Sequence, residues 1–313
     1  MTEEKFYISP GPHIFKKEST KKMMKDVVIA LIPAVIASIY FFRVRAVIVL
    51  LASAISCVGF EAFFQIAMKK KVTIFDWSAV VTGILFALIM PPSLPLWTCV
   101  LGGLVCIGLG KQLFGGLGHN IFNPALLSRA FLMAAFPTYL TKWNAPITLD
   151  AVTTATPLGM VKFEHNLTMN FSDLFTGNVS GSIGETSAIA LLIGGAYLLA
   201  KKVIDWRIPT AYTATVLVIA YVTNLVAPDK YAGMLFHVLA GGFLIGAIFM
   251  ATDPVTTPVT KNGRWIFGIG CGLITMIIRL WGGLPEGVMY SILLMNAITP
   301  IINRTTRPRR YGT

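Results

Sequence analysis

A threonine-rich segment in the middle of the chain carries the residues best suited to form a covalent bond. It reads Asp-Ala-Val-Thr-Thr-Ala-Thr from Asp150 to Thr156, and Pro157, Leu158 and Gly159 follow. Threonine is a poor helix former and Pro157 biases Thr156 away from the right-handed helical region, so we expect an exposed loop. An acidic residue six positions before the threonine is typical of an FMN acceptor, in which the phosphate esterifies the Thr156 hydroxyl. The alternative is a threonine-rich loop cap at a membrane surface.

The composition places this segment in a membrane protein. Hydrophobic residues make up 55% of the 313-residue chain, charged residues make up 13%, and the mean hydropathy is +0.71. A soluble domain carries about a quarter charged residues, and here long apolar runs recur along the whole sequence. We therefore predict an all-α polytopic membrane protein.

We expect about ten transmembrane helices in two halves of five. The first half covers residues 23–140, with spans at 23–42, 46–68, 77–90, 96–110 and 123–140. The second half covers residues 187–303, with spans at 187–200, 211–226, 234–250, 265–278 and 288–302. Residues 1–22 and 304–313 are terminal segments, and residues 141–186 form the long loop that bears Thr156. An odd number of spans in each half inverts one half relative to the other, as in transporters built from inverted repeats.

The basic residues orient the protein, because loops on the cytoplasmic side of a membrane are enriched in Lys and Arg. With a cytoplasmic N-terminus, nineteen basic residues fall in inside segments, including Lys111 in the loop after the fourth span, and six fall in outside segments, while Arg129 lies within a span. We therefore expect both termini in the cytoplasm and the Thr156 loop outside. The net charge of +12 is then a signal of topology. The sequence has no basic cluster interleaved with aromatic residues, so we expect no nucleic-acid partner.

Other cofactor chemistry finds little support in the sequence. The glycine pairs at 108/110 and 268/270 lack the third glycine of a dinucleotide-binding turn. The four histidines are scattered, so we expect no metal site. The four cysteines, at 57, 99, 106 and 271, lie in apolar stretches without Cys-x-x-Cys spacing, which predicts buried thiols. Residues 1–22 are polar and no cleavage site follows, so the first apolar run is expected to stay as a span.

Two further polar segments fall on the cytoplasmic side of this topology. The first contains Asn120 and Asn123-Pro124 just before the fifth span, and the second contains Asp253-Pro254 just after the eighth. One interpretation is that Asn123 and Asp253 are helix N-caps with proline at the first helical position. The other adds ligand contact in a cavity between the two halves. Amide side chains there offer both donors and acceptors to a flavin ring.

Charged side chains within spans are costly and are therefore candidates for function. Arg129, in the fifth span, is expected to hold either an anionic flavin or a carboxylate partner. Glu61, in the second span, is expected to extend toward the lysines at 69–71. Neither is expected to bind the transported ion.

Three motifs in this order resemble the D subunit of Rnf complexes, which are ion-translocating ferredoxin:NAD oxidoreductases. They are Gly-Leu-Gly-His-Asn-Ile-Phe-Asn-Pro-Ala-Leu at 116–126, the heptapeptide ending at Thr156 with Pro-Leu after it, and Phe-Met-Ala-Thr-Asp-Pro at 249–254. The same signatures recur in the B subunit of the related sodium-pumping NADH:quinone reductase, whose N-terminus is longer. The resemblance covers essentially the whole chain. It departs from many family members at Thr154, where they carry Gly or Ser, and we expect this to alter loop flexibility only.

The resemblance implies cofactors for the residues singled out above. FMN would be esterified to Thr156 by a flavin transferase, with Asp150 contributing to recognition by the transferase. The resemblance also leaves room for a noncovalent riboflavin, for which Asn120, Asn123 and Asp253 are the candidate cavity residues.

The resemblance also implies a place and partners for the chain. It would act in the bacterial cytoplasmic (inner) membrane, among lipid and partner subunits that supply iron–sulfur centres and a nucleotide site. The subunit would not be catalytic alone, and the complex would couple ferredoxin/NAD redox chemistry to translocation of Na⁺ or H⁺. A channel, a solute permease or an anchor for redox partners has the same architecture. The acceptor motif separates these classes, because none of the last three needs a flavin.

Overall fold

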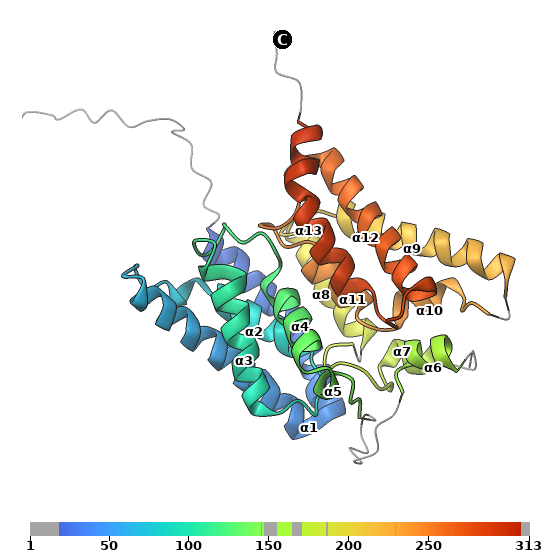
Figure 1. Cartoon of the computed structure of the whole chain (residues 1–313), viewed down its shortest axis with the longest axis horizontal. Coiled ribbons are helices and arrows are strands. Elements are labelled where there is room, and N and C mark those ends of the chain that lie inside the picture. The colour runs from blue at the N-terminus through green and yellow to red at the C-terminus, as the bar shows by residue number, and fades with distance from the viewer. Residues whose placement is uncertain are drawn as a thin grey trace, which may run out of the picture.

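The computed structural model describes residues 19–144, 146, 155–164, 171–185, 187–228 and 230–307. This part of the chain is helical and contains no strand (Figure 1). Its first-half elements are α1 (Thr20–Ala67), η1 (Ile74–Asp76), α2 (Ser78–Leu88), α3 (Leu96–Ile107), η2 (Gly108–Gln112), α4 (Pro124–Ala135) and α5 (Pro137–Leu140). The later elements are α6 (Pro157–Phe163), α7 (Phe171–Thr176), α8 (Ala188–Ala200), α9 (Arg207–Val226), α10 (Met234–Leu239), α11 (Phe243–Ile245), η3 (Gly246–Met250), α12 (Lys261–Trp281) and α13 (Val288–Thr305).

The first two expected spans are both contained in α1. This element runs for 48 residues, and Arg43 interrupts it with φ 51° and ψ −133°. A positive φ at a residue with a side chain is uncommon and marks a sharp change of direction. The kink therefore divides α1 at the short connection that the sequence predicts between residues 42 and 46.

Three described helices, α1, α9 and α12, are long and apolar enough to cross a membrane. Four shorter apolar stretches correspond to other expected spans: α2, α3 with η2, α4 and α8. The fifth expected span is not one helix. Helix α4 ends before Phe136, whose φ of −136° and ψ of 58° are not helical, and α5 begins at Pro137. Proline cannot donate the hydrogen bond that would continue α4.

In the described part of the chain, two short π-helices interrupt the regular α-helical hydrogen bonding, one in each half. The first, η2, continues α3, and the second, η3, continues α11. In each, an amide donates to the carbonyl five residues before it, as in the 2.9 Å bond from Leu113 N to Gly108 O and the 2.7 Å bond from Ala251 N to Gly246 O. Such widened turns are rare in proteins, and those that occur are often found at functional sites.

Small residues let the helices approach closely. A Cβ added at Gly194 in α8 would lie 2.1 Å from the Ala30 carbonyl oxygen in α1. A Cβ at Gly268 in α12 would lie 2.8 Å from the Ile208 oxygen in α9. Close backbone approach at small residues is the usual mode of helix association in membranes.

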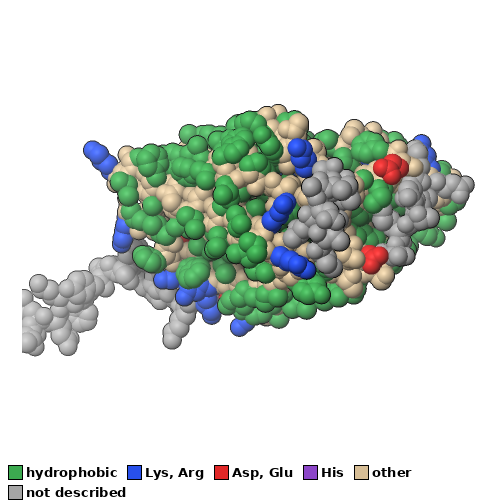
Figure 2. Space-filling view, turned by 90° about the horizontal axis from the view of Figure 1, so that it is seen from below, with side chains coloured by type: hydrophobic (Ala, Val, Ile, Leu, Met, Phe, Trp, Pro, Cys, Tyr) green, Lys and Arg blue, Asp and Glu red, His purple; other side chains and the backbone are tan. Residues whose placement is uncertain are grey.

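The surface is apolar over wide areas, as lipid contact requires. Figure 2 shows hydrophobic side chains spread widely over the described part of the face drawn there, with few charged groups among them. Exposed apolar residues occur on α1 and α9, including Ile36 (61% exposed), Ile55 (68%) and Val226 (79%). A soluble protein rarely exposes contiguous apolar surface of this extent. The four cysteines are buried free thiols, as predicted.

The helices around Thr156 lie on the opposite side of the protein from the end of α13. Figure 1 shows α6 and α7 at the lower edge of the molecule and the end of α13 at the top. A small apolar cluster holds α6 and α7 against α10, with Leu158, Leu174 and Phe236 among its buried members. This cluster fixes the start of α6, and with it the position of Thr156.

Candidate functional site

Thr156 is the N-cap of α6. Its backbone is extended (φ −71°, ψ 154°), Pro157 takes the first helical position, and its Oγ1 accepts a hydrogen bond from the Gly159 amide at 3.1 Å. The irregular backbone that the sequence predicts is therefore present, and the structure adds a helix-capping role for the Thr156 side chain. Capping uses a lone pair of the oxygen and leaves its proton free. Asp150 lies outside the described residues, so its role in recognition stays a prediction.

Thr156 also lines a pocket of about 460 Å³, which we name the Thr156 pocket. Its walls combine apolar side chains with two carboxylates, and they include Trp143, Pro157, Leu158, Val179, Glu185, Pro285 and Glu286. Mostly apolar walls with a few polar groups are typical of small-molecule sites.

Arg129 and the two glutamates form a charged cluster at this pocket. Arg129 Nη2 donates to Glu286 Oε2 at 2.8 Å, and the Gly242 amide donates to Glu286 Oε1 at 2.9 Å. Glu185 Oε2 accepts from the Ser182 amide at 3.3 Å. Burial, followed by the negative charge of Glu286, raises the pKa of Glu185 to about 7. Of the two partners expected for Arg129, the structure provides the carboxylate.

The turn between α10 and α11 is fixed beside this cluster by Arg279. Its guanidinium donates to the carbonyl oxygens of His237 and Ala240, the second at 3.1 Å. Gly241 follows with φ +71°, and a Cβ there would lie 2.5 Å from Leu158 Cδ1. The turn thus needs a glycine, both for its backbone conformation and for the contact with α6.

A larger cavity of about 770 Å³ lies near the start of α1, and we name it the Asn123 cavity. The structure brings Asn120, Asn123 and Asp253 together in its wall, although they come from different halves of the sequence. The other lining residues are mainly apolar and include Met24, Val27, Leu85, Leu198 and Phe249. The Asn123 cavity and the Thr156 pocket have no lining residue in common.

The capping interpretation is right for Asn123 and wrong for Asp253. Asn123 Oδ1 accepts from the amides of Ala125 and Leu126 at 3.1 and 3.3 Å, and Pro124 begins α4. Asp253 instead closes a turn, accepting from the Val255 amide at 3.2 Å. The next helix, α12, begins only at Lys261 with Thr260 as its N-cap. Aspartate forms such local turns as readily as it caps helices.

Asn123 and Asn120 also face beyond their own segment. Asn123 Nδ2 donates to the Met250 carbonyl oxygen in η3 at 3.4 Å, which joins the two polar segments. Asn120 is 8% exposed, and its Oδ1 has no hydrogen-bond partner among the described residues. A buried polar atom without a partner calls for an explanation such as a missing ligand. Amide groups in an apolar cavity can donate to and accept from the carbonyl and ring-nitrogen groups of a flavin.

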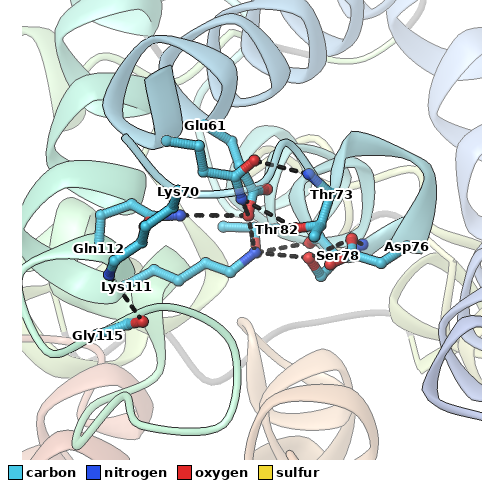
Figure 3. A network of polar contacts seen from close by, with 10 residues as sticks. Glu61, Lys70, Thr73, Asp76, Ser78, Thr82, Lys111, Gln112 and Gly115 are labelled. Carbon is cyan, nitrogen blue, oxygen red and sulfur yellow. Dashed lines mark hydrogen bonds and ion pairs between the residues drawn. The ribbon is translucent and has the colours of Figure 1, made fainter. Parts of the chain in front are cut away.

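A buried ion pair adjoins the Asn123 cavity (Figure 3). Lys111 Nζ, which lines the cavity, lies 2.5 Å from Glu61 Oε1 and donates to Ser78 Oγ at 2.5 Å. Both side chains are at most 2% exposed. Gln65 and Gln112 also donate to Glu61 Oε1, at 3.3 and 3.4 Å.

Two expectations about these charges are wrong. Glu61 does not extend toward the lysines at 69–71, since Lys70 donates to the Gly115 carbonyl at 3.2 Å instead. Lys111 is not a cytoplasmic loop residue, because η2 carries it into the protein. The widened turn explains the error, since helical periodicity in the sequence does not reveal a π-helix.

Sequence reasoning also missed Glu185 and Glu286. Both lie in short Gly- or Pro-containing segments that lead into a helix, Gly184-Glu185 before α8 and Pro285-Glu286-Gly287 before α13. An acidic residue beside such a break at the end of an apolar run was the available signal. The meeting of the two segments at Arg129 depends on tertiary packing.

Comparisons with known proteins place the chain in a family. A family model described as the NQR2, RnfD, RnfE family matches residues 7–312. The chain is 49% identical over 315 residues to the D subunit of the Na(+)-translocating ferredoxin:NAD(+) oxidoreductase complex of Acetobacterium woodii, covering 100% of this chain and 97% of the relative. It is 43% identical to the D subunit of the proton-translocating ferredoxin:NAD(+) oxidoreductase complex of Clostridium ljungdahlii, covering 98% and 96%.

A third relative is the D subunit of the ion-translocating oxidoreductase complex of Stutzerimonas stutzeri, at 38% identity with 95% and 93% coverage. The match thus extends over nearly the full length of the chain and of each of these relatives. The chain belongs to the NQR2, RnfD, RnfE family.

Proposed function

We propose that this chain is the D subunit of an ion-translocating ferredoxin:NAD oxidoreductase and that it carries FMN on Thr156. The observation that carries the proposal is the position of Thr156. It lies at the N-terminus of α6 and lines the Thr156 pocket. Full-length similarity to relatives named as D subunits of such complexes supports the assignment. A channel or permease would have no use for this acceptor.

The residues of the Thr156 pocket have distinct tasks in this proposal. The Thr156 oxygen forms the phosphoester and keeps its lone pair toward the Gly159 amide. Trp143, Leu158 and Pro285 offer apolar walls that exclude water from a flat ring. A bound flavin supplies electron transfer, and the protein supplies its position and its electrostatic surroundings.

The Asn123 cavity is proposed as the site of a noncovalent riboflavin. Asn120 Oδ1 offers an acceptor without a partner among the described residues. The Asn123 side chain accepts from the Ala125 amide and donates to the Met250 carbonyl oxygen in η3. Asp253 is held by Val255 and Thr256 and gives this wall a fixed carboxylate. One flavin on each side of the protein would give the subunit two redox centres.

We further propose ten spans in two inverted halves, with both termini in the cytoplasm of a bacterium and α6 on the outer side of its inner membrane. The excess of basic residues in the segments assigned to the inside supports this orientation. Lipid would cover the apolar surface, and other subunits of the complex would deliver and remove electrons. The translocated ion would be Na⁺ or H⁺, the ions named for two relatives.

The test uses the full chain produced together with a flavin transferase. Denaturing gels viewed under ultraviolet light should show flavin fluorescence on the wild type and on Thr156→Ser, which keeps a hydroxyl. Thr156→Ala should abolish fluorescence without reducing the amount of chain in the membrane. Fluorescence that persists in Thr156→Ala would contradict the proposed acceptor.

A further inference from the structure

The two glutamates of the Thr156 pocket differ in how their charges are compensated. Glu286 has a partner for each oxygen, Arg129 on Oε2 and the Gly242 amide on Oε1. Among the described residues, Glu185 Oε2 accepts from the Ser182 amide at the long distance of 3.3 Å, and the Ser182 side chain and the charge of Arg129 also favour its carboxylate. Its Oε1 is inaccessible to solvent and has no hydrogen-bond partner among the described residues. Glu185 is therefore the group of the cluster that a proton would stabilise most.

The two carboxylates converge on one point of the backbone beside Thr156. A Cβ added at Gly242 would lie 2.5 Å from Glu286 Oε1 and 3.0 Å from Glu185 Oε1. Glu185 and Glu286 line the same pocket as Thr156. Like charges so close to each other disfavour full ionisation of both.

Among the described residues, the remaining charges around Glu185 come from neighbouring helices. Arg129 of α4 pairs with Glu286, and Arg279 of α12 interacts electrostatically with both glutamates. Lys162 of α6 directs its ammonium to the carbonyls of Ile278 and Leu284 instead. Both arginines are already committed, Arg129 to Glu286 and Arg279 to backbone oxygens. A change of charge in the pocket would therefore be felt mainly by Glu185.

We propose that Glu185 is the proton-accepting group of the Thr156 pocket, taking up a proton from the outer aqueous side when the flavin on Thr156 takes up an electron. This inference rests on the proposed function. The electron comes from a reduced centre of the surrounding complex, and the only bond formed is the O–H bond of Glu185. When the electron passes to the next centre, that bond breaks and the proton returns to water. Glu286 and Arg129 are positioning residues that set the charge around Glu185.

The protonation state of Glu185 near neutral pH fits this role. Its pKa is raised to about 7, by burial first and by Glu286 second. A negative charge added to the pocket raises this pKa further, because a like charge disfavours the carboxylate. At a pH between the pKa of Glu185 with oxidised flavin and its pKa with reduced flavin, reduction of the flavin makes Glu185 take up a proton. Below about pH 7 the carboxyl is neutral before and after reduction, and it contributes no pH dependence.

The experiment is a redox titration of the covalent flavin in the purified full chain, between about pH 5.5 and 8.5, a range that brackets the raised pKa of Glu185. We expect Glu185→Gln and the wild type to share one midpoint potential at the acidic end, where the wild-type carboxyl is neutral. Above about pH 7 the wild-type potential should fall below that of Glu185→Gln. The difference should grow by at most about 59 mV for each tenfold change in proton activity, for one electron. Glu185→Asp keeps a titratable group and should retain the pH-dependent difference.

Glu164→Gln is the matched control, because Glu164 is an exposed carboxylate at the end of α6 and does not line the pocket. It should follow the wild type at every pH. In-gel fluorescence of the same samples reports whether flavin is attached. Absence of Thr156-dependent fluorescence from the wild type would refute the proposed function and this inference with it. Intact fluorescence with parallel curves for the wild type and Glu185→Gln would refute the role of Glu185 alone.

Discussion

Removing the ammonium of Lys111 should destabilise the protein far more than removing the Glu61–Lys111 pair as a whole. At 2.5 Å and an effective dielectric constant of about 20, the attraction between the two charges is roughly 7 kcal/mol. Desolvation of each ion costs several kcal/mol and offsets most of this attraction. Lys111→Met leaves the Glu61 carboxylate buried without its cation, which should cost about 3–5 kcal/mol.

The double variant Glu61→Gln/Lys111→Met should recover most of that loss. A glutamine at position 61 is neutral, and its amide oxygen can still accept from Gln65 and Gln112. The control is Lys70→Met, because Lys70 is exposed and bonds only a backbone oxygen. Surface substitutions of this kind usually change stability by about 0.5 kcal/mol or less.

The assay is equilibrium unfolding of the purified chain in mixed micelles, with increasing mole fractions of a denaturing detergent. The wild type, both single variants of the pair, the double variant and Lys70→Met are compared by their midpoints, and the double-mutant cycle gives the coupling energy. A Lys111→Met midpoint equal to that of Lys70→Met would refute the reasoning. So would a double variant that is no more stable than Lys111→Met alone.

Three further predictions concern packing, the second cavity and topology. Gly194→Ala should destabilise the α1–α8 contact by about 1–3 kcal/mol, because its Cβ would meet a backbone oxygen, whereas Gly59→Ala meets nothing within 4 Å; detergent unfolding compares the two. Asn123→Ala should cost about 0.5–2 kcal/mol through the lost cap and should also lower acid-extractable flavin while covalent flavin persists. Unchanged extractable flavin would leave Asn123 a capping residue only. Reporter domains fused after Lys142 and after Lys202 should report outside and inside locations, and the reverse pair of signals would contradict the proposed orientation.

Sequence patterns predicted the parts of this protein that depend on local physics. The apolar composition predicted an all-helical membrane protein, and the short polar stretch around Arg43 predicted the break in α1. The Asn123-Pro124 pair predicted a helix start, and the structure has one there. One of the two interpretations of the sequence placed Asn120, Asn123 and Asp253 in one cavity between the two halves, and in the structure all three line one cavity.

Features that depend on tertiary packing were not predictable in the same way. Lys111 was assigned to a loop, because only the π-helix η2 carries its side chain to Glu61. The cluster of Arg129, Glu185 and Glu286 joins three segments that are far apart in the sequence. No spacing rule connects such residues, although each is a charge at the end of, or inside, an apolar run.

The proposed function depends above all on FMN being esterified to Thr156. The most direct measurement is tandem mass spectrometry of the peptide spanning Asp150 to Lys162, taken from the full chain produced with a flavin transferase. We predict a peptide whose mass is increased by FMN less one water, with fragment ions that place the added mass on Thr156. An unmodified peptide in a fluorescent sample, or fragment ions that place FMN on Thr153 or Thr154, would contradict the claim.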